Sequence, residues 1–83
     1  MSGTVELSRE QASEWLAGVL CKHFEVSPER IHSNADLHLD MDLDSIDAAD
    51  IVLMFNETFQ RDIDMRAFRE VRTFAQALDL LGR

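Results

Sequence analysis

The segment Asp44-Ser45-Ile46-Asp47 is the part of the sequence best suited to chemistry, because it places one hydroxyl group between two carboxylates. Aspartate is a favoured N-cap, and a second acid three positions later completes a capping-box-like pair, so Asp44 and Asp47 predict a helix that begins at Ser45. The N–H groups at a helix start favour negative charge and suit a phosphate group. The pattern therefore predicts an exposed serine that is suited to become a phosphodiester.

A catalytic role for Ser45 would need a histidine base and an oxyanion hole. The sequence contains no G-x-S-x-G elbow and no recognisable arrangement that would orient a base. We therefore interpret Ser45 as the substrate of another enzyme, and we predict no catalytic residue in this chain.

Three aspartates before the serine have the D-x-D-x-D spacing that opens a calcium-binding loop, at Asp40, Asp42 and Asp44. The glycine of the sixth position is missing, and Ile51 stands where the glutamate of the twelfth position should be. The histidines and Cys21 do not have the spacing of a zinc site. We predict no specific metal site, while weak, nonspecific binding of divalent ions to the crowded carboxylates remains open.

The charge of the chain is strongly negative, at −8 over 83 residues, and the imbalance is concentrated in the middle. Residues 31–60 contain no lysine or arginine, but they contain Asp36, Asp40, Asp42, Asp44, Asp47, Asp50 and Glu57. Such a zone repels nucleic acid, whose binding depends on Lys and Arg, and it favours partners with basic protein surfaces. A charged face that only keeps the protein soluble is the alternative.

Length and composition favour one small domain over residues 1–83. A chain of this length buries little more than about 60 % of its unfolded surface, which leaves no room for a separate catalytic domain. No apolar run is long enough to span a membrane, and Met1–Glu6 lacks the basic and apolar regions of a signal peptide. The single cysteine, Cys21, cannot form an internal disulfide, which suits a reducing compartment. We expect a cytoplasmic monomer.

Capping patterns and apolar spacing predict an all-α fold. The predicted elements are a first helix that opens with Ser8 and Gln11, a second over Ser45–Phe59, a short third helix capped by Asp64, and a last helix that opens with Thr73 and Gln76 and stops at Gly82. Together they form a small four-helix bundle, with three main helices, a short third helix, and a long loop between the first and second helices.

The segment between the first two helices is predicted to be a loop. Ser27-Pro28 is typical of one isolated helical turn. Leu37, Leu39, Met41 and Leu43 then alternate with polar residues, which on pattern alone would suit a half-buried strand. Aspartate is a poor strand residue, however, and the sequence offers no second strand to pair with it. We therefore expect a loop whose leucines anchor to the helical core.

The second helix is predicted to have two faces. Its apolar arc contains Ala48, Ala49, Ile51, Val52, Leu53, Phe55 and Phe59. The opposite, acidic arc contains Asp47, Asp50, Glu57 and Thr58, with Met54 in its middle and Ile46 near its edge. We interpret this second arc as a partner-recognition face, on which the acids steer the approach and the exposed Met54 makes an apolar contact.

The segment Met41–Asp47, followed by an acidic and apolar helix that ends in Phe59, resembles the phosphopantetheine attachment region of acyl carrier proteins. The order of elements is similar over nearly the whole chain. The resemblance implies that Ser45 receives a 4'-phosphopantetheine arm from coenzyme A, transferred by a separate magnesium-dependent phosphopantetheinyl transferase. The thiol of the arm would hold acyl groups as thioesters. Asp44 matches the family's motif aspartate, which helps to position the serine and the metal in the transferase complex.

The resemblance also implies a set of partners. They are a ketosynthase and other acyl-processing enzymes with basic docking surfaces, and the matching recognition residues are Ile46, Asp47, Asp50, Met54 and Glu57. The doublet Asp42-Leu43-Asp44 and the segment Phe68–Thr73 resemble carriers of fatty-acid-like secondary pathways, such as aryl polyene synthesis. Fatty-acid and polyketide pathways stay open. Asp42 stands where the family usually has glycine, which implies a stiffer and more acidic loop.

The predicted core consists of Leu37, Leu39, Ala49, Val52, Phe55, Phe59, Phe68, Val71 and Phe74. In an acyl carrier, this core could admit part of the acyl chain, whereas a fully packed core without a cavity is the alternative. An acidic helical adaptor that binds a basic partner without any covalent group is the competing function. A small calcium-responsive module is a weaker competitor.

Overall fold

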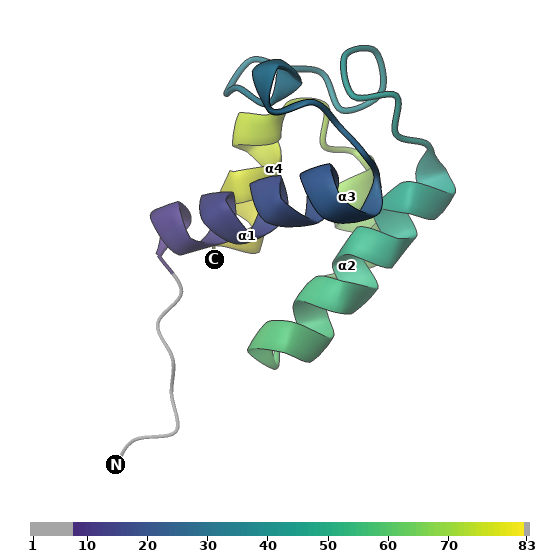
Figure 1. Ribbon diagram of the computed structural model, residues 1–83. Helices are drawn as coiled ribbons and strands as arrows, with labels where there is room; N and C mark the ends of the chain where they lie inside the picture. The colour runs from purple at the N-terminus through teal and green to yellow at the C-terminus, as the bar shows by residue number, and fades with distance from the viewer. Residues whose placement is uncertain (1–7, 83) are drawn as a thin grey trace.

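Every regular element in the described part of the chain is a helix. The computed structural model describes residues 8–82. Figure 1 shows the elements in order: α1 (Arg9–His23), a 3-10 turn (Pro28–Arg30), α2 (Ser45–Phe59), α3 (Met65–Arg69) and α4 (Phe74–Leu81). The prediction of an all-α bundle with a short third helix and a long loop before α2 is confirmed. The interpretation of Met1–Glu6 lies outside the described residues.

Local sequence signals set the starts of the helices. In α1, α2 and α4, the side chain of the N-cap accepts a hydrogen bond from the N–H three positions later, and that residue's side chain accepts one in return. The three pairs are Ser8 with Gln11, Asp44 with Asp47, and Thr73 with Gln76. Asp64 caps α3 by accepting the N–H of Arg66 at 2.8 Å. The predicted helix starts are therefore confirmed, and α4 stops at Gly82 as predicted.

The helices pack around one apolar core. Helix α1 lies against α4, α2 lies against α3, and α3 also contacts α4. The largest fully buried side chains are Phe55, Leu16, Leu20, Ile51 and Leu81. Trp15 packs edge-on against Phe55, with their ring centroids 5.3 Å apart, so an aromatic contact joins α1 to α2.

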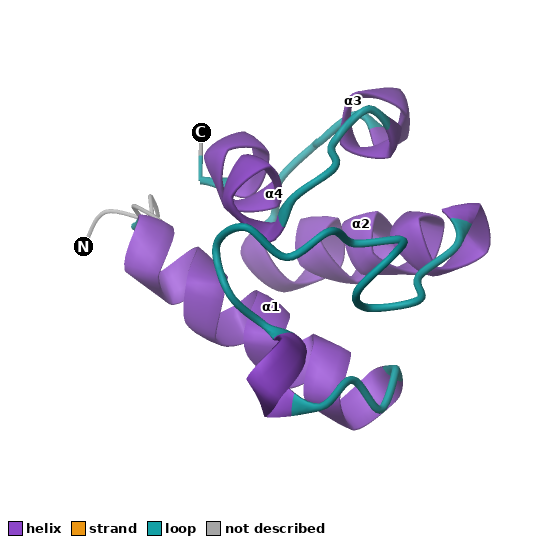
Figure 2. Cartoon of the chain, turned by 90° about the horizontal axis from the view of Figure 1, so that it is seen from above, coloured by secondary structure: helices purple, strands orange, loops and turns teal. Residues whose placement is uncertain are grey.

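The long loop is held by the segment that precedes α4. The N–H of Leu37 donates to the carbonyl of Arg72 at 2.8 Å, and the N–H of Phe74 donates to the carbonyl of Ala35 at 3.0 Å. Only an isolated bridge forms between these two segments, and no strand is present within residues 8–82. Figure 2 looks down on this loop where it crosses over the helices. The prediction of a loop anchored to the core is confirmed.

The prediction that Leu39 belongs to the core is wrong, because 84 % of its surface is exposed. The carboxylate of Asp36 accepts the N–H groups of His38 and Leu39, each at 2.8 Å. The N–H of Asp40 donates to the carbonyl of Asp36 at 2.9 Å. This tight turn interrupts the alternating pattern and directs Leu39 outward. The other apolar residues of the segment remain buried: Leu37, Met41 and Leu43.

Two assignments on the faces of α2 are also wrong. Leu53 was placed on the apolar arc but is 58 % exposed, and Met54 was expected to be exposed but is half-buried. A helical wheel locates apolar side chains, whereas the buried sector depends on where the neighbouring helices pack. The remaining predicted core residues divide into buried Leu37, Val52, Phe55, Phe68 and Phe74, and half-buried Ala49, Phe59 and Val71.

Candidate functional site

Ser45 is the first residue of α2, and its side chain is exposed. The Asp44 Oδ1 atom accepts the N–H of Asp47 at 2.9 Å, and the Asp47 Oδ2 atom accepts the N–H of Asp44 at 3.2 Å. These bonds fix the first turn of the helix around the serine. Within residues 8–82, the Ser45 hydroxyl has no histidine or carboxylate partner that would act as a base. The geometry therefore leaves the hydroxyl exposed and without a base to activate it.

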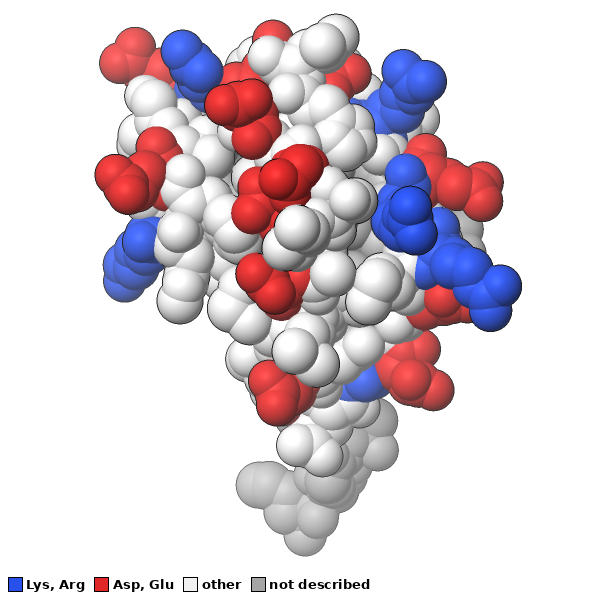
Figure 3. Space-filling view, turned by 90° about the vertical axis from the view of Figure 1, so that its right-hand side faces the viewer, with Lys and Arg blue, Asp and Glu red and all other residues white. Residues whose placement is uncertain are grey.

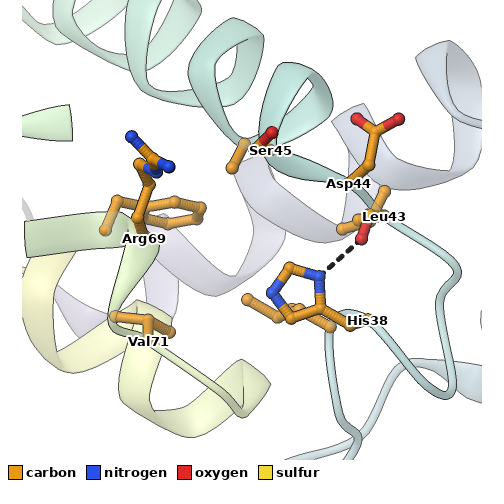
Figure 4. Close-up of a pocket in the computed structure, with 9 residues that line it drawn as sticks. His38, Leu43, Asp44, Ser45, Arg69 and Val71 are labelled. Carbon is orange, nitrogen blue, oxygen red and sulfur yellow. Dashed lines mark hydrogen bonds between the residues drawn. The ribbon is translucent and has the colours of Figure 1, made fainter. Parts of the chain in front are cut away.

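A cavity of about 210 Å³ lies beside Ser45, between the start of α2, α3 and the loop (Figure 4). Its apolar lining consists of Leu37, Leu43, Ala48, Phe68 and Val71. Its polar lining consists of His38, Asp44, Ser45 and Arg69. The serine hydroxyl thus stands at the rim of an apolar space, where a group attached to it would have access both to solvent and to the interior.

His38 is a cavity residue that the sequence analysis did not identify. Its Nδ1 atom lies 2.6 Å from the carbonyl oxygen of Leu43, as the dashed line in Figure 4 shows. Because a carbonyl oxygen can only accept, Nδ1 carries the hydrogen of this bond. The bond holds the imidazole against the loop and leaves Nε2 without a partner among the described residues. No spacing in the sequence indicates this contact, which results from the turn of the loop.

Asp36 shapes the turn from which His38 projects. Hydrogen bonds from the N–H groups of Leu39 and His38 hold the pKa of the Asp36 carboxyl below its ordinary value. The charged carboxylate therefore stabilises the turn, and the turn places the His38 imidazole at the cavity.

The exposed side of α2 is acidic. Asp50 and Glu57 are exposed, Asp47 is half-buried, and α2 contains no basic residue. Ile46 lies on the same side and is 70 % exposed. Figure 3 shows acidic groups running in a column down this side of the molecule, with basic groups toward its flanks. Three of the five predicted recognition residues are therefore exposed, and the half-buried Asp47 and Met54 contribute less of their side chains to this surface.

The aspartates of the D-x-D-x-D segment serve different backbone contacts. The Asp40 carboxylate accepts the N–H of Asp36 at 2.7 Å, while that of Asp44 caps α2. In the part of the chain that the structure describes, no three His, Cys, Asp or Glu side chains are grouped so as to hold a metal ion. In the same part, none of the helices combines the length and the apolar character needed to cross a bilayer.

A family model described as "Phosphopantetheine attachment site" matches residues 14–81 of this chain. The chain belongs to this family. It is also similar to a protein named acyl carrier protein 2 from Ralstonia nicotianae (strain ATCC BAA-1114 / GMI1000), with 29 % identity over 72 residues, which cover 87 % of this chain and 89 % of that protein. The resemblance to acyl carrier proteins is thus confirmed at the level of the family.

Family membership identifies the group that the chain bears and the kind of role that it has. The cofactor is 4'-phosphopantetheine, joined covalently, and the chain is a carrier rather than an enzyme. The site fits such a group, because an exposed serine at a helix start stands beside an apolar cavity. When bound, the cofactor supplies the thiol that the chain itself does not place here. Membership also implies a phosphopantetheinyl transferase and acyl-processing enzymes as partners.

Proposed function

We propose that Ser45 is the attachment point of 4'-phosphopantetheine and that the chain carries acyl intermediates as thioesters on this arm. The observation that carries the proposal is the position of Ser45, which is exposed at the first position of α2 and lines the adjoining cavity. Helix N-termini favour the negative charge that a phosphodiester would bring. The Oδ2 atom of Asp44 accepts no hydrogen bond within residues 8–82 and would be available to a transferase complex.

The cavity supports a carrier whose cargo is partly enclosed. Its volume of about 210 Å³ is smaller than that of ordinary ligand pockets, which begin near about 300 Å³. The ring of Phe68 is buried in its wall and limits its size. We therefore expect it to take a short acyl group or the first part of a longer one, which is compatible with fatty-acid-like, polyketide or aryl polyene intermediates.

We propose that the acidic side of α2 binds the partner enzymes. The residues assigned to this surface are Ile46, Asp47, Asp50, Met54 and Glu57. Exposed carboxylates on a helix without basic residues are complementary to a basic docking surface on a transferase, a ketosynthase or another acyl-processing enzyme. Ile46, exposed within this surface, would supply an apolar contact.

The chain is further proposed to act as one carrier domain and as a monomer in the cytoplasm. Its single cysteine, Cys21, is free and half-buried, which agrees with a reducing compartment.

The attachment point is tested by coexpression with a phosphopantetheinyl transferase and intact-mass analysis. The unaltered chain should gain the mass of one phosphopantetheine, and Ser45→Ala should gain none. Ser27→Ala is the matched control, because Ser27 is also an exposed serine near the start of a helical segment, and its side chain makes no capping hydrogen bond. A full mass gain in Ser45→Ala, or none in the unaltered chain, would refute the assignment.

The acidic surface also favours a second candidate, a helical adaptor that binds a basic partner without the covalent arm. Ser45→Ala separates the two functions. Full-strength binding of the unmodified protein and of Ser45→Ala to the same partner, without any acyl transfer to the modified chain, would favour the adaptor.

A further inference from the structure

Arg69 is the only lysine or arginine that lines the cavity beside Ser45. It is the last residue of α3, and its side chain is exposed. Within residues 8–82, its guanidinium takes part in no ion pair and no hydrogen bond. The chain has a net charge of −8 and 16 Asp and Glu residues, yet this cation forms no ion pair within residues 8–82. The rim therefore has one group suited to an anion that the chain itself does not supply.

The neighbouring carboxylate of Asp44 does not neutralise Arg69. Figure 4 shows Ser45 between Arg69 on one side and Asp44 on the other, with the Asp44 carboxylate directed away from the arginine. That carboxylate also accepts the N–H of Asp47 at 2.9 Å as the cap of α2. Within residues 8–82, the two groups form no ion pair.

Attachment of the arm would place an anion at this rim. The phosphorus of phosphopantetheine bonds directly to the Ser45 Oγ atom, so the two non-bridging oxygens, which share one negative charge, cannot leave the rim. A guanidinium is planar and donates two parallel hydrogen bonds to oxygens of a phosphate group. The three methylenes of Arg69 allow its head group to move, while the buried Phe68 beside it anchors the backbone.

We propose that Arg69 binds the phosphodiester of the attached arm, so that the modified protein has a contact between α3 and the start of α2 across the rim of the cavity. The proposal rests on the assignment of Ser45 as the attachment point. Its consequence is that modification tightens the wall through which the cargo enters, because α3 is only five residues long and carries the wall residue Phe68.

The experiment compares the unaltered chain, Arg69→Gln and Arg66→Gln, each in unmodified and fully modified form as verified by intact mass. Arg66 is the matched control, because it lies on α3, is exposed and does not line the cavity, and its substitution changes the net charge equally. In the unaltered chain, modification should shift the side-chain Nε–H resonance of Arg69 in ¹H–¹⁵N NMR spectra. The ³¹P resonance should be the same in Arg66→Gln as in the unaltered chain and displaced in Arg69→Gln.

Thermal unfolding gives a second measure. An exposed ion pair raises the Tm of a domain of this size by about 2 to 4 °C. The rise in Tm on modification should therefore be about 2 to 4 °C larger in the unaltered chain and in Arg66→Gln than in Arg69→Gln. High salt should reduce this difference. Arg69→Lys should retain part of the effect, because it keeps the charge but not the planar fork.

Each outcome bears on the proposal. Suppose that the chain takes the arm in full, but modification changes neither the Arg69 resonance nor the Tm difference between the unaltered chain and Arg69→Gln. This result would overturn the present proposal and leave the proposed function intact. An equal loss of stability in modified and unmodified Arg69→Gln would show a structural role and overturn it as well. A chain that takes no phosphopantetheine would overturn both.

Discussion

Asp42 is held in a backbone conformation that favours glycine, with φ at 57°. The residues on either side of it, Met41 and Leu43, are buried, and both are fixed by hydrogen bonds. The N–H of Met41 donates to the carbonyl of Asp36 at 3.2 Å, and the N–H of Leu43 donates to the carbonyl of Leu37 at 3.0 Å. The backbone at Asp42 therefore cannot relax without disturbing two core side chains. This geometry explains why glycine is usual here in the acyl carrier proteins that the motif resembles.

Replacing Asp42 by glycine and by alanine separates the backbone effect from the charge, because both variants remove the same carboxylate. In the left-handed region a Cβ atom costs about 1 to 2 kcal/mol. Glycine avoids this cost, but its greater freedom in the unfolded chain offsets about 0.5 to 1 kcal/mol of the stability gained. We therefore expect Asp42→Gly to be more stable than Asp42→Ala by about 0.5 to 1 kcal/mol, or about 2 to 8 °C in Tm.

Urea unfolding with linear extrapolation measures this difference, with the two variants fitted to a common m-value. Circular dichroism of both variants checks that the helical content is unchanged. If Asp42→Ala were as stable as Asp42→Gly, the backbone at residue 42 would not be constrained as the hydrogen bonds on either side of it imply, and the reasoning would fail.

Two further predictions concern charge. Asp50→Lys should weaken binding to a transferase about fivefold or more with an unchanged Tm. Glu14→Lys makes an equal charge change at an exposed position of α1 and should not weaken binding. Equal dissociation constants for both variants would contradict the recognition surface. The lowered pKa of Asp36 means that its charged form stabilises the fold above its unfolded pKa, about 3.9, and that this stability is lost as the pH falls through the lower folded value. Asp36→Asn should therefore lose less stability below about pH 4 in urea unfolding, and parallel pH profiles would exclude this role for the carboxylate.

The helix starts and the likeness to a carrier follow from local sequence. A capping box needs only two side chains three positions apart, so Asp44 with Asp47 predicts both the start of α2 and the position of Ser45. The acidic character of α2 is equally local, because its exposed side contains no basic residue in any packing arrangement. Because the motif and the order of the helices both depend on local sequence, the family resemblance could be recognised from the sequence.

The cavity and the sides of the elements that become buried depend on tertiary packing. The pattern from Leu37 to Leu43 did not predict the exposed Leu39, since the turn at Asp36 decides which side chains reach the core. Likewise, His38 and Arg69 are distant from each other in sequence and line the cavity beside Ser45 only because the loop turns back and α3 packs against α2. The sequence by itself determined where each helix begins and which hydroxyl is presented, because those depend on neighbours within one turn. Only the tertiary structure decided what surrounds that hydroxyl. Burial and cavities arise from contacts between segments that are distant in sequence, and no local pattern encodes how such segments are placed relative to one another.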